Sequence, residues 1–222
     1  MARRSASASS TSASISSTSA DYASGVTTTT TMPVRRTIAR GLLKVSRWKT
    51  SGEVPESAIL VGAPHTSNWD WVLTMLLAWD SEVNIRLLVK NSLFKGPLAP
   101  ILKATGAVCL DRDNPGQTIR EMLAEAEESD TFLLGLAAEG TRSRGDYWKS
   151  GFYRISQQTG LPITLGFIDR PTRTVGWGVT FHPTDDVVAD MDKVREFYAQ
   201  VSGIHPESFT PPRLREEDAT TS

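Results

Sequence analysis

The stretch AILVGAPHTSNWDWVLTMLLAW, residues 58–79, decides how this chain folds. Its first four residues are apolar, as in a short strand that is buried on both faces. Glycine, alanine and proline then interrupt the run, and an apolar segment from about Asn68 to Trp79 is long enough for a helix. A strand that passes through a loop into a helix is the repeating unit of an α/β sheet. Here the loop carries His65, and four residues separate it from Asp70.

The same alternation of apolar strands and amphipathic helices continues along the chain. A proline after Asn114 predicts the start of a helix, and Gly160 predicts the end of another. We expect further strands at 86–89, 107–110, 132–138, 163–168 and 175–181, and helices from 115, over 152–159 and over 190–202. The pattern predicts an α/β fold with a mixed, largely parallel sheet flanked by helices.

Composition divides the 222 residues into four parts. Residues 1–31 are almost entirely Ser, Thr and Ala, which predicts a disordered tail. Arg3 and Arg4 are also compatible with an organellar targeting segment. A further alternative is that the protein starts at Met32. Residues 33–49 form a basic amphipathic helix, residues 50–205 form the main domain, and the proline-rich residues 206–222 form an irregular C-terminal tail.

Charge and cysteine content exclude several classes of protein. The formal net charge is −1, so no strong positive field favours nucleic acid as a partner. A single cysteine excludes an internal disulfide and is compatible with a reducing compartment. The most apolar window, residues 71–79, is far shorter than the ~20 residues that span a bilayer.

The helix at 33–49 has the composition of a membrane-surface helix. Its apolar residues recur at helical spacing as Val34, Ile38, Leu42 and Val45. It has no acid, and its bases are Arg35, Arg36, Arg40, Lys44, Arg47 and Lys49. Such a helix can lie on anionic lipid. The alternative is an ordinary helix that packs on the domain and keeps its basic face in water.

His65 and Asp70 are candidates for acid–base chemistry. A carboxylate that accepts a hydrogen bond from one imidazole nitrogen leaves the other nitrogen free to take a proton. Ser67 and Asp70 also match a capping box, in which the carboxylate only stabilises the start of a helix. The two interpretations are compatible, because a capped helix end would hold Asp70 still.

A second cluster, Glu139-Gly140-Thr141-Arg142, follows the apolar run at 132–138. Glycine permits close approach of the backbone, and arginine offers a forked donor to a phosphate. Arg112 is a further candidate phosphate ligand. The alternatives are a solvated surface turn for the cluster and an ion pair within a loop for Arg112.

Together the two clusters resemble the motifs of the glycerolipid acyltransferase superfamily, which includes lysophosphatidic acid and glycerol-3-phosphate acyltransferases. The first motif, N-H-x-S-x-x-D, resembles residues 64–70, with Pro64 in the place of asparagine. The third, P-E-G-T-R-S, resembles residues 138–143, with Ala138 in the place of proline. Weaker resemblances at 106–112 and 161–165 complete the order of the family's four motifs.

The resemblance implies acyl transfer from acyl-CoA or acyl-carrier protein to the hydroxyl of a lysophospholipid such as 1-acylglycerol-3-phosphate. His65 would be the base and Asp70 its partner, while Arg112, Glu139, Gly140, Thr141 and Arg142 would bind the acceptor, with no metal or resident cofactor required. We expect a peripheral protein on the cytoplasmic, inner face of a membrane. A thioesterase or lipid hydrolase with the same pair, and a non-catalytic membrane-surface protein, remain alternatives.

Overall fold

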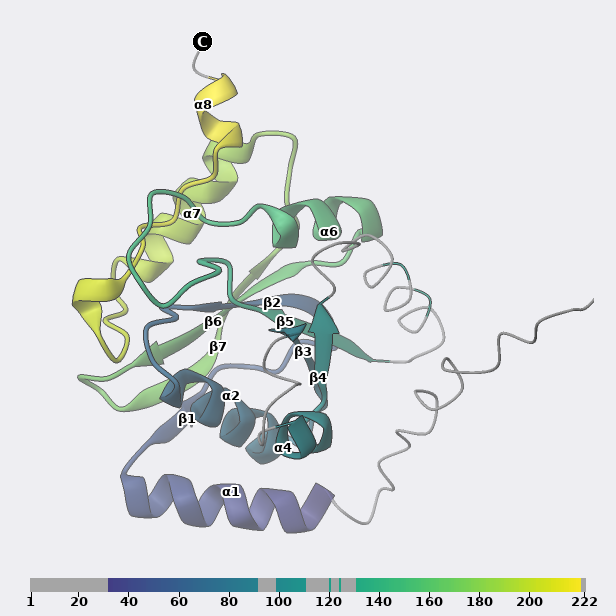
Figure 1. Ribbon diagram of the computed structural model, residues 1–222, viewed down its shortest axis with the longest axis vertical. Coiled ribbons are helices and arrows are strands. Elements are labelled where there is room, and N and C mark those ends of the chain that lie inside the picture. The colour runs from purple at the N-terminus through teal and green to yellow at the C-terminus, as the bar shows by residue number, and fades with distance from the viewer. Residues whose placement is uncertain (1–31, 92–98, 111–119, 121–123, 125–130, 221–222) are drawn as a thin grey trace, which may run out of the picture.

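The computed structural model describes residues 32–91, 99–110, 120, 124 and 131–220 (Figure 1). Its centre is a seven-stranded sheet in the order β1-β7-β6-β2-β5-β3-β4. The strands are β1 Lys49–Ser51, β2 Ser57–Ala63, β3 Ile85–Lys90, β4 Ala107–Leu110, β5 Phe132–Leu136, β6 Ile163–Asp169 and β7 Thr174–Phe181. Neighbouring strands are parallel except β6 and β7, which are antiparallel. The mixed, largely parallel sheet predicted from the sequence is confirmed.

Strand β2 lies between β6 and β5, with Val61 opposite Leu136 of β5 and Leu165 of β6. All three strands are strongly apolar and buried, as their uninterrupted apolar sequences predict. Because they are parallel, their carboxyl ends meet at one edge of the sheet, where ligands bind in open α/β folds. The loops that follow β2 and β5 therefore come together at this edge.

Helices cover both faces of the sheet (Figure 1). Helices α6 Gly151–Thr159 and α7 Val187–Tyr198 lie on one face, and α2 Trp69–Asp80 and α4 Ala99–Ala104 lie on the other. Two apolar cores result, one built around Phe152 and Tyr198 and the other around Leu73 and Leu77. The helix that we expect after Asn114 falls largely outside the described residues.

Helix α1, Met32–Ser46, packs on the outer side of α2 (Figure 1). Its buried residues are Ala39 and Leu43, whereas the predicted apolar stripe is exposed, with Val34, Ile38, Leu42 and Val45 between 47% and 85% accessible. The chain leaves the helix at Ser46, three residues before the predicted end, because Lys49 already pairs with Thr174 in the sheet.

Two of the helix's arginines bind the end of α2 and the turn that follows it. Arg36 forms an ion pair with Glu82, and Arg40 forms one with Asp80. The ordinary packing role and the exposed apolar stripe are thus both present, on different sides of one helix.

The C-terminal residues are more ordered than the sequence suggested. The expectation of an irregular tail over 206–222 is wrong in part, since Pro206–Ser208 form a 3-10 helix and Glu216–Thr220 form helix α8. Leu214 between them is fully buried, and Thr210 is almost so. Prolines stop regular structure locally, but they do not prevent a segment from packing on a core.

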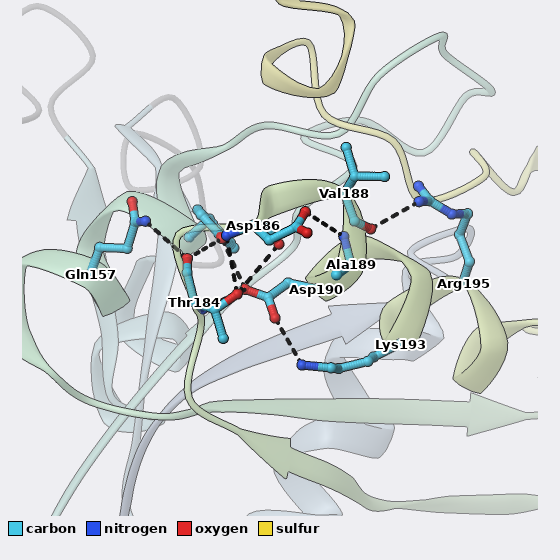
Figure 2. A network of polar contacts seen from close by, with 9 residues as sticks. Gln157, Thr184, Asp186, Val188, Ala189, Asp190, Lys193 and Arg195 are labelled. Atoms are coloured by element: carbon cyan, nitrogen blue, oxygen red, sulfur yellow. Dashed lines mark hydrogen bonds and ion pairs between the residues drawn. The ribbon is translucent and has the colours of Figure 1, made fainter. Parts of the chain in front are cut away.

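A polar network fixes the start of α7 (Figure 2). The carboxylate of Asp190, which is inaccessible to solvent, accepts hydrogen bonds from Thr184, from the hydroxyl of Tyr153 and from Lys193. Asp186 caps the helix by accepting from the N–H of Ala189 at 3.0 Å. These bonds join α7 to α6 and to the loop after β7.

Candidate active site

The turn after β2 carries His65. Strand β2 ends at Ala63, a cis peptide bond joins Ala63 to Pro64, and His65 follows. The imidazole is partly buried, with 23% of its side chain accessible, and its Nδ1 lies 3.5 Å from Oδ2 of Asp70. This arrangement directs Nδ1 toward the carboxylate, as the spacing predicts.

Asp70 holds the turn as well as facing the imidazole. Its Oδ2 accepts the main-chain N–H groups of Thr66 and Ser67, both at 2.7 Å. Helix α2 starts at Trp69, after Asn68, and the hydroxyl of Ser67 accepts from the N–H of Trp69 at 3.2 Å. The structural and functional interpretations of Asp70 therefore coexist in one residue, although Asn68 rather than Ser67 is the capping position.

Glu139 is held between two main-chain donors. It is 2% accessible, its Oε1 accepts the main-chain N–H of His65 at 2.6 Å, and its Oε2 accepts that of Thr210 at 3.1 Å. These contacts support the His65 turn. Glu139 is also among the residues that line the cavity described below, and its binding of the acceptor stays a prediction.

The rest of the second cluster is open to solvent. Gly140 has φ +68°, and a Cβ there would lie 3.0 Å from Cγ of Lys149, which explains the glycine. Thr141 and Arg142 are exposed. The positive charge of Arg142 acts on both His65 and Asp70, so the two clusters form one site.

Burial dominates the electrostatics of the site. Burial, together with the smaller effect of the Arg142 charge, lowers the pKa of His65 from 6.5 to about 4. Burial raises the pKa values of Asp70 and Glu139, against the opposing effect of the N–H groups that donate to them. His65 is therefore neutral near pH 7 and able to accept a proton.

A cavity of about 1730 Å³ opens at this edge of the sheet. Its lining includes the polar residues His65, Asp70 and Arg142, and it includes apolar residues of β3 and β5 together with Leu102 of α4. The cavity can accommodate a molecule with a charged end and a long apolar part.

Known proteins share this sequence and architecture. A family model described as Acyltransferase matches residues 45–165, which is more than half of the chain. The chain belongs to this family. The crystal structure of the 1-acyl-sn-glycerophosphate (LPA) acyltransferase PlsC from Thermotoga maritima has a similar fold, with a TM-score of 0.54 and 14% identity over 76% of this chain and 77% of that one. No match was found among curated proteins.

The match confirms that the chain belongs to the glycerolipid acyltransferase superfamily, as its motifs indicated. In this acyltransferase, His65, Asp70 and Arg142 surround one cavity, whereas Arg112 lies outside the described residues. Within the described part of the chain, no three His, Cys, Asp or Glu side chains gather as metal ligands do.

Sequence reasoning missed two residues that contact the site, Thr66 and Thr210. Trp71 also lines the cavity, and its indole N–H has no hydrogen-bond partner among the residues described. The contact of Thr210, which is distant in sequence, had no local signal.

Proposed function

We propose that the protein transfers a fatty acyl group from an acyl thioester, acyl-CoA or acyl-carrier protein, to the free hydroxyl of 1-acylglycerol-3-phosphate or a related lysophospholipid. One observation carries the proposal: the His65–Asp70 pair and Arg142 line the same cavity, whose lining is largely apolar. The cation fits the acceptor's phosphate, and the apolar walls fit an acyl chain.

The chemistry follows from the position of the imidazole. His65 removes the proton of the acceptor hydroxyl through Nε2 as the oxygen attacks the thioester carbonyl carbon. The tetrahedral intermediate collapses, the carbon–sulfur bond breaks, and the imidazolium returns the proton to the departing thiolate. Asp70 holds the Nδ1 side of the ring and stabilises the transient positive charge.

The deciding experiment is incubation of the protein with labelled acyl-CoA or acyl-carrier protein and a panel of lysophospholipids, followed by mass analysis of the products. We expect label in a phosphatidic acid, and none with His65→Ala, since removal of a general base costs about 10²–10⁴ in rate. Thioester consumption that proceeds equally well without an acceptor would instead identify a thioesterase. No consumption of either donor would support the non-catalytic alternative.

The proposal includes attachment to the cytoplasmic, inner face of an anionic membrane, where the acceptor resides. Within the described residues, no helix has the length and apolar character needed to cross a bilayer. The exposed stripe of α1 supports peripheral attachment, as do Lys44 and Arg47, which are exposed at the end of the same helix. Arg36 and Arg40 are left unchanged in the flotation test described next, because their ion pairs hold α1 against the end of α2 and the turn after it.

Vesicle flotation tests the attachment. We expect wild type to float with vesicles that contain anionic lipid, and the double variant Ile38→Glu, Leu42→Glu to remain in solution. Thr37→Glu is the matched control, since Thr37 is exposed on the same helix but is not part of the stripe. Equal flotation of the double variant and wild type would eliminate α1 as the membrane contact.

A further inference from the structure

We propose that a segment near the end of the described chain, Gly203–Thr210, belongs to the catalytic machinery because it holds both motif loops in position. We call it the C-terminal strap. It lies beyond residues 45–165, the stretch that the family model matches. The proposal rests on the function proposed above, and it adds Thr66 and Thr210 as positioning residues for that reaction.

The first contact of the strap is with the His65 turn. The hydroxyl oxygen of Thr66 accepts the main-chain N–H of His205 at 3.0 Å, while the N–H of Thr66 donates to Asp70. Gly203 has φ +68°, and a Cβ at that position would lie 2.8 Å from Cβ of Pro64. The strap therefore packs directly against the residues on either side of His65.

The second contact is with the loop that carries Arg142. Thr210 is 1% accessible, and all three of its polar groups are used. Its hydroxyl accepts the N–H of Gly145 at 2.9 Å, and its carbonyl accepts the indole N–H of Trp148 at 2.7 Å. Its own N–H donates to Glu139, whose other oxygen accepts from His65. One residue thus holds the loop at two points and is linked to the His65 turn.

The Thr66 hydroxyl bonds the strap, whereas the Thr210 hydroxyl bonds Gly145 of the Arg142 loop and also Glu139. This difference in contacts predicts different main kinetic effects. The hydroxyl of Thr66 fixes the turn that sets the geometry of His65 and Asp70, so its loss should lower kcat. The hydroxyl of Thr210 fixes the loop that carries Arg142, so its loss should raise KM for the phosphate-bearing acceptor. In each variant, KM for the acyl donor should change less than the parameter that the variant is expected to alter.

The test compares Thr66→Val and Thr210→Val with Thr164→Val. Valine keeps the branched shape and removes only the hydroxyl. Thr164 is an equally buried control, since its hydroxyl bonds that of Thr180 at 2.8 Å away from both loops. We expect Thr66→Val to lose about tenfold in kcat, because small misplacements of reacting groups are costly, with acceptor KM changed less than about twofold. Thr210→Val should show the reverse, and Thr164→Val neither.

The conservative variant Thr66→Ser keeps the hydroxyl and should restore kcat to near the wild-type value. Unchanged kcat in Thr66→Val, or an equal loss in Thr164→Val, would overturn the proposal. If Thr66→Val fails to fold, Glu139→Gln takes its place in the test. The amide of glutamine has only one acceptor oxygen, so either the N–H of His65 or that of Thr210 then loses its acceptor. Wild-type kcat and KM in Glu139→Gln would also overturn the proposal.

A substrate-free measurement separates this proposal from the proposed function. If wild type transfers no acyl group, the function fails, but the strap can still be tested by NMR. Amide exchange at His205 should accelerate in Thr66→Val and stay at the wild-type rate in Thr164→Val. Unchanged exchange at His205 in Thr66→Val would show that the Thr66 hydroxyl does not hold the strap.

Discussion

Binding of the acceptor alone should raise the pKa of His65. Burial and the charge of Arg142 lower that pKa from 6.5 to about 4 in the free protein. The difference corresponds to about 3 kcal/mol, at about 1.36 kcal/mol for each pH unit. A phosphate bound to Arg142 neutralises one of the two causes and brings negative charge toward the imidazole. His65 should then be a stronger base when the acceptor is present than when the site is empty.

The assay is an NMR titration of the imidazoles in the absence of donor, so that no turnover occurs. The chain has only three histidines, and His65→Gln assigns the relevant signal. We expect a midpoint near 4 for the free protein and a higher midpoint with a saturating, soluble short-chain acceptor. Circular dichroism at each pH confirms that the chain is folded, since an unfolded histidine titrates near its ordinary value of 6.5.

Arg142→Gln separates the two causes. Its midpoint in the free protein should lie above 4 but below 6.5, because burial persists after the charge is removed. Arg144→Gln is the matched control, as Arg144 is exposed nearby and should leave the midpoint at about 4. The reasoning is refuted if His65 titrates near 6.5 in the folded wild type, or if bound acceptor leaves its midpoint unchanged.

Acid stability depends on the same group. Because the pKa of His65 is lower in the folded state than in the unfolded state, the folded chain binds fewer protons between pH 6.5 and about 4. His65 therefore removes stability as the pH falls through this window, by up to about 3 kcal/mol. His65→Gln should flatten the loss of stability over that range in chemical denaturation, and an equally steep loss would contradict the assignment.

Two further variants test single residues. Asp70→Asn should lower kcat at least about 10²-fold, because an amide cannot stabilise the imidazolium as a carboxylate does. The melting temperature should fall only modestly. Near-wild-type turnover would mean that Asp70 only caps the helix. Asp190→Ala should instead lower the free energy of unfolding by about 2–4 kcal/mol in urea denaturation, since it removes a buried acceptor shared by Tyr153, Thr184 and Lys193. The kcat of the remaining folded protein should be unchanged. A fall in kcat there would show that this network reaches the site.

Periodicity predicted the elements well but not which side of a helix faces the core. The apolar stripe of α1 recurs at helical spacing, yet its members are exposed, and Ala39 and Leu43 are the residues that are buried. Spacing identifies a face, but only a partner decides whether protein or lipid covers it. The antiparallel direction of β7 was not predicted for a similar reason, since an apolar run carries no direction.

The sequence predicted one side of the active site and could not predict the other. His65 and Glu139 each follow a buried strand, and once β2 and β5 are paired in parallel, their carboxyl ends bring the two residues together. The strap reaches the same place through main-chain N–H groups of His205 and Thr210, which bond residues 139 and 71 positions away. Every residue except proline has such a donor, so no side-chain pattern marks the ones that are used. The missing information is the tertiary structure. The motif alone predicts that Glu139 binds a ligand, and its role in positioning the His65 turn can be recognised only when the donors opposite its two oxygens are known.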